Sequence, residues 1–186
     1  PLLASFAEAL GFIVDKYNIR NYKIRDFTFN QFVYIVLLMT PFLFLFFNVS
    51  SNAIDGKYLL LFAGLIIASL LANIFFVFGF KHEKLSEVCP VRMLTPLLTV
   101  LFAAVLFESE RDPVIFTAAI VAAATLFLSH LRKDYLYFNK YLGAVLLSDF
   151  FVAMEFIISK LLLDVYSPFT LYFLRCVFLG LLLYAI

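Results

Sequence analysis

The sequence has few charged residues and no tryptophan. Charged side chains make up 15% of its 186 residues, whereas soluble domains are about 25% charged. Hydrophobic residues reach 65%, and the mean hydropathy is +1.02. In water such a chain would expose more apolar surface than folding can bury. The shortage of charge therefore excludes an ordinary soluble domain and indicates a protein that is solvated by lipid.

Other scarcities exclude further classes. The net charge is only +1 and no basic stripe is present, so no nucleic-acid partner is expected. The two cysteines, Cys89 and Cys176, lie in or beside apolar segments and are predicted to act as small, inert hydrophobic residues. The two histidines, His82 and His130, have no nearby residues of ligand type. We therefore predict no metal site and no cofactor.

What the sequence does contain is long apolar runs. A membrane-spanning helix needs about 20 mostly apolar residues. The segments that approach or meet this length are 2–14, which is short, and 27–47, 57–80, 88–107, 113–131, 139–160 and 168–186. The connectors are short, so successive helices should be antiparallel neighbours. The sequence predicts an all-α, polytopic transmembrane helix bundle, as a fragment cut inside one helix at the front and inside or just after another at the back.

Local signals mark some of the helix boundaries. Asp112 and Ser167 each precede a proline, the pattern of an N-cap followed by proline at the first helical position. Pro41 and Pro96 lie within apolar runs, where each could kink its helix.

Small residues indicate where helices approach closely. Gly64, Ala68 and Ala72 recur at every fourth position of the segment 57–80. This spacing places them on one face of a helix and lets the backbone of a neighbour come near in lipid. We predict tight helix packing along this face.

Two similar segments suggest an internal repeat. The first apolar helix ends GFIVDK at Lys16, and the sixth ends EFIISK at Lys160. Each is followed by a connector and then by Phe-Thr, at 27–28 and 169–170. Five spans separate the two copies, and an odd number inverts the second copy in the membrane, a common plan of secondary transporters.

Two longer stretches carry a family resemblance. Residues 85–110, LSEVCPVRMLTPLLTVLFAAVLFESE, hold Ser and Pro at the entry, a second Pro inside and an acidic residue about three turns later. Residues 143–175 hold Gly, an apolar helix ending in Lys, a short turn, Ser-Pro and then Arg. In this order the chain resembles the EamA-like family of the drug/metabolite transporter superfamily.

The resemblance implies a fold and a function. The expected fold is ten helices in two inverted five-helix repeats, with the first repeat at 1–138, its first helix truncated, and the start of the second at 139–186. The chain would hold about seven of the ten helices. The implied function is secondary transport of a small metabolite or drug-like solute by alternating access, as a multi-pass protein of the cell membrane. Phe107 replaces a glycine that the family usually has, and Val33 stands where the repeat would place a counterpart of Arg175.

Membrane orientation stays open. Positively charged loops tend to be cytoplasmic. The loops after the first, third and fifth spans hold most cations: Lys16, Arg20, Lys23, Arg25, Lys81, Lys84, Arg132, Lys133 and Lys140. This count places them in the cytoplasm, with the first helix running inward, whereas the family is usually drawn with a cytoplasmic N-terminus.

Three carboxylates are expected at membrane depth, namely Glu8, Asp149 and Glu155. A carboxylate at the bilayer centre costs about 2.5–3.5 kcal/mol, so it is usually buried, paired or wetted by a cavity. Asp149 and Glu155 are six residues apart, about 240° around a helix, so they should face different ways. We predict that at least one faces the protein interior. Each either lines a central cavity that binds a cation or proton, or pairs structurally with a cation or a tyrosine hydroxyl.

Glu155 is the preferred functional acid because Ser148 and Ser159 share its helix face. A desolvated glutamate would suit proton coupling, and the alternative is a salt bridge to Arg175 or Lys160.

Several other polar residues are candidates for the cavity. Lys16 and Lys160 end equivalent helices and either snorkel to the interface or reach a substrate. Arg175, about two turns inside its helix, either snorkels or contacts an anion or carboxylate. Asn73 is expected to make an interhelical hydrogen bond or contact substrate, and Arg92 is expected at the interface.

Three functions are open to such a chain: a transporter, a non-transporting membrane scaffold or assembly partner, and an intramembrane enzyme. The sequence has no HExxH, GxGD or glycine-rich nucleotide loop, and the two acids of the sixth span face apart, so an enzyme is not expected. The expected partners are the lipid bilayer, a small-molecule substrate and a second copy in a homodimer.

Overall fold

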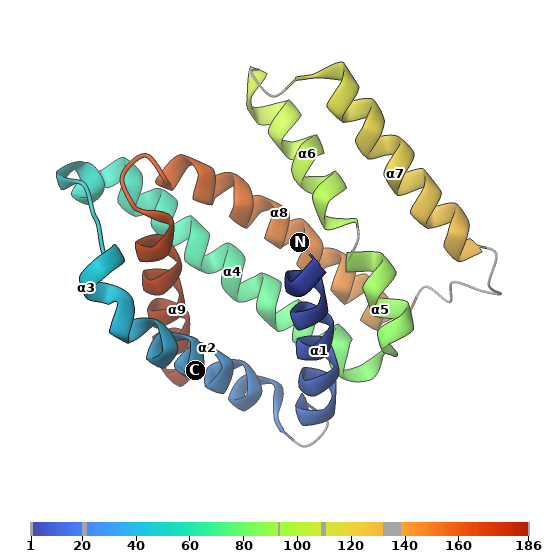
Figure 1. Ribbon diagram of the computed structural model, residues 1–186, viewed down its shortest axis with the longest axis horizontal. Helices are drawn as coiled ribbons and strands as arrows, with labels where there is room; N and C mark the ends of the chain where they lie inside the picture. Colours follow the sequence, from blue (N-terminus) through green and yellow to red (C-terminus); the bar gives the residue numbers. More distant parts are fainter. Residues whose placement is uncertain (1, 20–21, 93, 109–110, 132–138, 186) are drawn as a thin grey trace.

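The computed structural model describes residues 2–19, 22–92, 94–108, 111–131 and 139–185, and within these residues the chain is helical with no strand. In the same part of the chain the β-structure is confined to an isolated antiparallel bridge between Val49 and Tyr166. The predicted all-α fold is confirmed, and the protein is a polytopic helix bundle (Figure 1).

The helices follow the predicted apolar segments. In chain order they are α1 (Leu2–Ile19), α2 (Ile24–Met39), η1 (Thr40–Phe42), α3 (Leu43–Phe46), η2 (Ser51–Ile54), α4 (Gly56–His82), α5 (Leu85–Arg92), α6 (Thr95–Leu106), α7 (Pro113–Leu131), α8 (Lys140–Leu162) and α9 (Pro168–Ala185).

Within the described residues, five segments are long and apolar enough to cross a membrane: Ile24–Phe46, Gly56–His82, Leu85–Leu106, Lys140–Leu162 and Pro168–Ala185. In the same part of the chain, Pro113–Ala122 is a shorter apolar helical segment. The first apolar segment forms α1, which continues beyond the predicted end at Val14 to Ile19. These lengths and compositions make the protein a multi-pass membrane protein.

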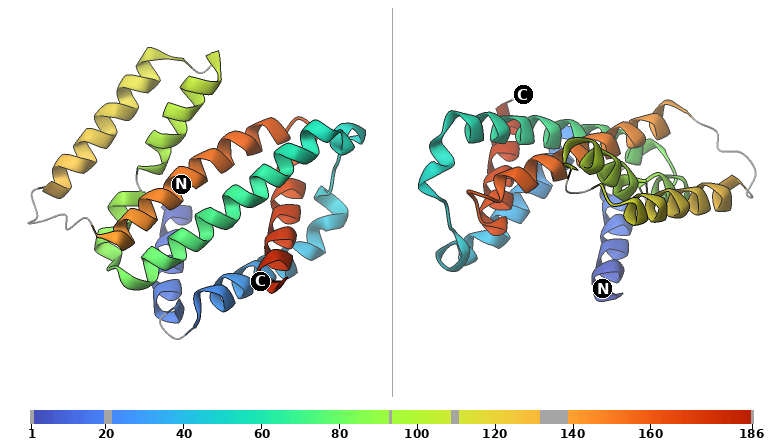
Figure 2. Two further views of the ribbon diagram at one scale, coloured as in Figure 1. Left: turned by 180° about the vertical axis from the view of Figure 1, so that it is seen from behind. Right: turned by 90° about the horizontal axis from the view of Figure 1, so that it is seen from above.

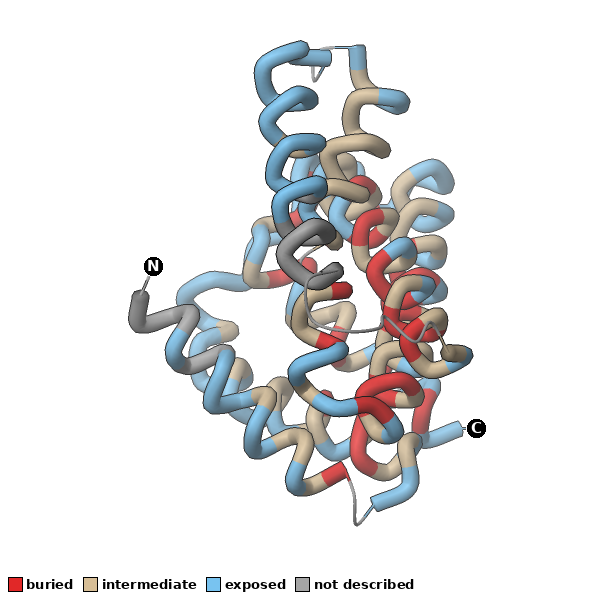
Figure 3. Tube along the Cα trace, turned by 90° about the vertical axis from the view of Figure 1, so that its right-hand side faces the viewer, coloured by how far each residue is buried: buried red, intermediate tan, exposed pale blue. Residues whose placement is uncertain are grey.

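The bundle is built around the pair α4 and α8, which run side by side (Figures 1 and 2). At one end of this pair α2 packs against α9. At the other end α6 packs on α8, and α7 packs on α6. Buried residues follow the α4–α8 pair, whereas α7 is mostly exposed along its described side chains (Figure 3). In a membrane the exposed apolar faces meet lipid or further protein.

Prolines interrupt two of the predicted spans. Pro41 lies in the first turn of η1, which separates α2 from α3. The fourth span, predicted over 88–107 with a possible kink at Pro96, is divided into α5 and α6: Pro90 lies inside α5, and Pro96 lies in the first turn of α6. Proline has no N–H to continue a helical ladder, which is the physical reason for the kinks predicted at Pro41 and Pro96.

The predicted N-caps are confirmed. Asp112 Oδ1 accepts a hydrogen bond from the Val114 N–H at 2.8 Å, and Ser167 Oγ accepts one from the Thr170 N–H at 3.2 Å. Asn139 caps α8 in the same way, since its Oδ1 accepts two backbone N–H groups at 2.9 Å each. These side chains satisfy N–H groups that the first turn leaves without helical partners.

The small-residue face of α4 packs inside the bundle. Ala68 is 7% exposed and Ala72 is 2% exposed. The tightest approach lies further along α4, at Gly79, where an added Cβ would meet Val145 Cγ2 at 2.5 Å and the Tyr141 carbonyl oxygen at 2.6 Å. Only a glycine lets the α8 backbone come this close to α4.

Candidate functional site

A cavity of 480 Å³ lies among α2, α4, α5, α8 and α9. Its volume falls within the range of about 300–1,000 Å³ that small-molecule sites usually have. Its lining residues are Gln31, Phe32, Tyr34 and Ile35 of α2, Asn73 of α4, Arg92 of α5, Val152 and Glu155 of α8, and Tyr172 and Arg175 of α9. The cavity therefore gathers charged and polar side chains from helices that are otherwise strongly apolar.

Glu155 binds two neighbouring helices from α8. Its Oε1 forms an ion pair with Nη1 of Arg175 on α9, and its Oε2 accepts a hydrogen bond from the Ser69 hydroxyl of α4 at 2.8 Å. Glu155 is 8% exposed. Both carboxylate oxygens thus have partners, which offsets part of the cost of burying the charge.

Asp149 forms a second ion pair, with Arg92 of α5. The Arg92 Nη1 donates to Asp149 Oδ1 at 2.9 Å, and the aspartate side chain is fully buried. Arg92 lines the cavity, whereas Asp149 lies behind it and does not. The interfacial position predicted for Arg92 stays a prediction; the structure adds that a buried carboxylate of α8 pairs with its guanidinium, whose side chain is 29% exposed.

The two acids of α8 therefore bind different arginines. Both are buried, which confirms the prediction that at least one faces the protein interior. Their spacing directs Asp149 towards α5 and Glu155 towards α9, as expected from about 240° of helical rotation. The salt bridge to Arg175, named as one alternative for Glu155, is the contact observed.

Aromatic rings orient the two arginines. The Arg175 guanidinium carbon lies 4.5 Å from the centroid of the Tyr172 ring, and that of Arg92 lies 4.8 Å from the centroid of the Phe76 ring. Such cation–π contacts are stronger where water is excluded. Each guanidinium is therefore held by a carboxylate and by an aromatic face, which leaves it little freedom to turn.

Asn73 lines the cavity, and among the described residues its side chain bonds within its own helix. Its Nδ2 donates to the Ser69 carbonyl at 2.7 Å, one turn earlier in α4. The expected interhelical hydrogen bond was wrong, because the backbone of its own helix lies within reach of the amide nitrogen.

Two further predicted residues, Lys16 and Lys160, lie away from the cavity. Lys16, near the end of α1, donates to the carbonyls of Phe80 and Glu83 at the C-terminus of α4, where cations are favourable. Lys160 is exposed, with its ammonium 4.9 Å from the centroid of the Phe107 ring. The side chain of Glu8 lies outside the part that the structure describes.

Sequence reasoning missed two polar contributors. Gln31 lines the cavity and also donates to Asp15 Oδ2 at 3.1 Å, and Ser69 binds Glu155. Both are polar residues within the apolar helices α2 and α4, and this contrast was the available signal.

At the end of α1, burial raises the pKa of Asp15, and the hydrogen bond from Gln31 partly counteracts this rise.

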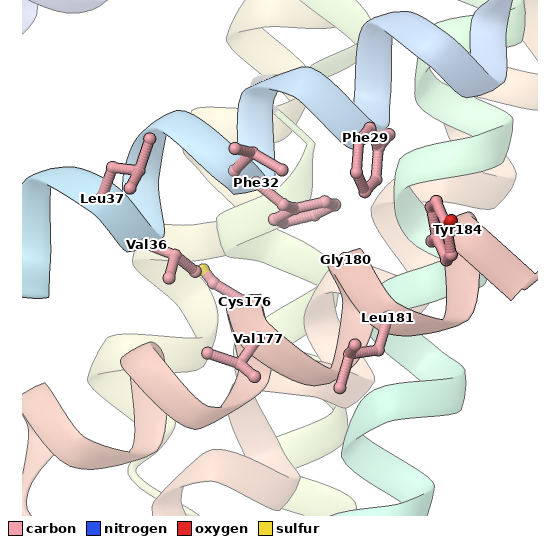
Figure 4. Close-up of a pocket in the computed structure, with 10 residues that line it drawn as sticks. Phe29, Phe32, Val36, Leu37, Cys176, Val177, Gly180, Leu181 and Tyr184 are labelled. Atoms are coloured by element: carbon pink, nitrogen blue, oxygen red, sulfur yellow. The ribbon is translucent and has the colours of Figure 1, made fainter.

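A separate groove between α2 and α9 is almost wholly apolar (Figure 4). Phe29, Phe32 and Tyr184 point into it, with Gly180 providing a flat stretch of α9. Cys176 also lines it and is fully buried. Without charged lining residues, this groove is a poor match for a polar solute.

The sequence profile of the EamA-like transporter family matches residues 2–131. This is well over half of the chain, so the protein belongs to the EamA-like transporter family, within the drug/metabolite transporter superfamily. The searches of curated proteins and of solved structures found no match.

Proposed function

We propose that this protein is a secondary transporter that moves a small solute across the cell membrane by alternating access, with the cavity as its solute site. The observation that carries the proposal is that Arg92, Arg175 and Glu155 line one cavity, with Arg175 paired to Glu155 and Arg92 paired to the buried Asp149 outside the lining. Charged groups at membrane depth are costly and usually mark a solute or ion pathway.

The packing of α2 on α9 supports an inverted-repeat design. In the proposed division, 1–138 and 139–186, these are the second helices of the two repeats. They contact each other across the cavity, as two elements related by a pseudo-twofold axis would. Thr28 of α2 and Thr170 of α9, which correspond in the two segments, are both buried.

Glu155 is the proposed coupling residue. Its contacts join α8 to α4 and α9, so a proton on its carboxylate would weaken the link to Arg175 and free α9 to move. Asp149, deeper and outside the cavity lining, would hold Arg92 in both states. Asp149 and Glu155 bind different arginines, so the proposal gives them separate roles.

The test is transport by the full-length protein in proteoliposomes. A mixture of labelled amino acids, monocarboxylates and amines is supplied outside, with and without a pH gradient. Uptake of at least one solute above protein-free liposomes is expected. If none is taken up, the transporter proposal fails and the scaffold alternative gains.

Glu155→Gln keeps the shape and removes the charge of the proposed coupling residue. It should reduce uptake and flatten its pH dependence. Glu108→Gln is the matched control, since the Glu108 side chain is 90% exposed. Size-exclusion profiles check that both variants fold. Normal uptake by Glu155→Gln with unchanged pH dependence would remove Glu155 from the coupling role.

A further inference from the structure

We propose that the cavity binds a small monocarboxylate with an apolar, ring-containing body, and that Arg92 and Arg175 hold the carboxylate. This inference rests on the proposed function only in taking the cavity as the solute site. It names a chemical class of solute and the residues that select it.

The arginines are the charged groups that a solute in the cavity reaches most easily. In each pair the arginine is the more exposed partner: 29% for the Arg92 side chain against 0% for Asp149, and 18% for Arg175 against 10% for Glu155. Asp149 is outside the lining, and both oxygens of Glu155 are engaged. A cationic solute therefore meets few available acceptors, whereas an anionic solute meets guanidinium N–H groups.

The arginines also keep donors for a ligand. A guanidinium has five N–H donors, and both ion pairs are made through Nη1. Within the described residues, the buried Nε of Arg175 has no hydrogen-bond partner. Planar N–H pairs match the two oxygens of a carboxylate and bind it through charge-assisted hydrogen bonds. The ion pairs fix the orientation of the arginines, and the N–H groups outside these pairs remain for the solute.

Among anions, charge balance favours a monoanion over a dianion. The four side chains Arg92, Asp149, Arg175 and Glu155 sum to zero charge, so a bound monocarboxylate leaves one net negative charge in the bundle. A dianion would leave two, and the cost of unbalanced charge grows in a low-dielectric interior. This argues for a carboxylate over a doubly charged phosphate.

The rest of the lining selects the body of the solute. Phe32, Ile35 and Val152 present apolar carbon, and Tyr34 and Tyr172 add aromatic rings. Aromatic walls pack well against another ring, by stacking or edge contact. The amides Gln31 and Asn73 each donate one of their two N–H groups, to Asp15 and to the Ser69 carbonyl, which reduces the donors left for a polyhydroxylated solute.

The experiment compares three probes with the same ring and different charge. Radiolabelled phenylacetate, phenylacetamide and phenethylamine are tested by equilibrium dialysis against the full-length protein in nanodiscs, with empty nanodiscs as background. We expect phenylacetate to bind about tenfold or more tightly than phenylacetamide, the difference that a charge-assisted hydrogen bond produces. Phenethylamine should bind least.

Variants then locate the binding site. Arg92→Gln and Arg175→Lys should each weaken phenylacetate binding by about tenfold or more. Arg25→Gln is the matched control, because Arg25 pairs with Asp26 on the exposed surface. The control should bind phenylacetate as the unaltered protein does. The probe series on the unaltered protein needs no variant to fold.

Three results overturn the inference: tighter binding of phenethylamine, equal binding of phenylacetate and phenylacetamide, or phenylacetate binding that neither cavity substitution changes. Dialysis does not require transport, so the two proposals fail separately. Solute uptake in proteoliposomes without phenylacetate binding rejects the solute class alone. Phenylacetate binding without uptake of any solute rejects the transporter proposal alone.

Discussion

Gly79→Ala tests the close packing of α4 against α8. The new Cβ would lie 2.5 Å from Val145 Cγ2, 2.6 Å from the Tyr141 carbonyl oxygen and 3.3 Å from the Val145 nitrogen. Two of these three atoms belong to the α8 backbone and cannot move without shifting the helix. Overpacking of this kind costs about 1–3 kcal/mol, and contact with the backbone favours the upper end.

The alanine also has a compensating effect. Replacing glycine within a helix stabilises it by about 0.5–1 kcal/mol. The net destabilisation is therefore about 2 kcal/mol, which corresponds to a fall in Tm of about 4–8 °C for a chain of this size. Gly64→Ala is the matched control, because its Cβ would meet only Ile158 Cδ1 of α8, at an ordinary 3.8 Å. The control should leave Tm unchanged or raise it slightly.

Thermal unfolding can be followed with a dye that fluoresces on reaction with thiols. Cys176 is fully buried in the folded protein and becomes reactive when the bundle opens, while the half-buried Cys89 contributes background. If Gly79→Ala unfolds at the temperature of the unaltered protein or above it, α4 and α8 are not as close as the structure has them.

Three further substitutions test other contacts. Asp149→Asn leaves Arg92 without its carboxylate and should destabilise the protein by about 1–3 kcal/mol. The exposed control Asp26→Asn should cost under about 1 kcal/mol. Similar falls in Tm for the two variants would contradict the buried Arg92–Asp149 pair. Ser167→Ala removes the N-cap of α9 and should cost about 1 kcal/mol, with a fall in Tm as the readout; an unchanged Tm would mean that the cap contributes nothing. Burial raises the pKa of Asp15, so the folded protein binds this proton more tightly than the unfolded chain, and stability falls as pH rises above the ordinary aspartate value of about 3.9. Asp15→Asn should therefore raise Tm at pH 8 more than at about pH 4, close to that ordinary value, and an equal change at both would reject the burial argument.

The lipid environment, the helices and several helix ends could be predicted from the sequence. Apolar runs of about 20 residues with little charge can be satisfied only by helices in lipid, because each helix closes its own backbone hydrogen bonds. Capping is equally local: Asp112 and Ser167 bind N–H groups two and three residues further on. The separation of Asp149 and Glu155 on different sides of α8 also followed, since it depends only on the helical repeat.

The partners of the polar groups were decided by the tertiary structure. Arg92 is 57 residues from Asp149, and Ser69 is 86 residues from Glu155. Which of several cations reaches a given acid depends on how each helix is rotated and how deeply it lies, and Gly79 helps to set this by letting α4 and α8 approach. The sequence placed charged residues within apolar segments. The pairing of Arg92 and Arg175 with their carboxylates beside one cavity required the packed bundle, because desolvation and geometry act only once the helices are in contact.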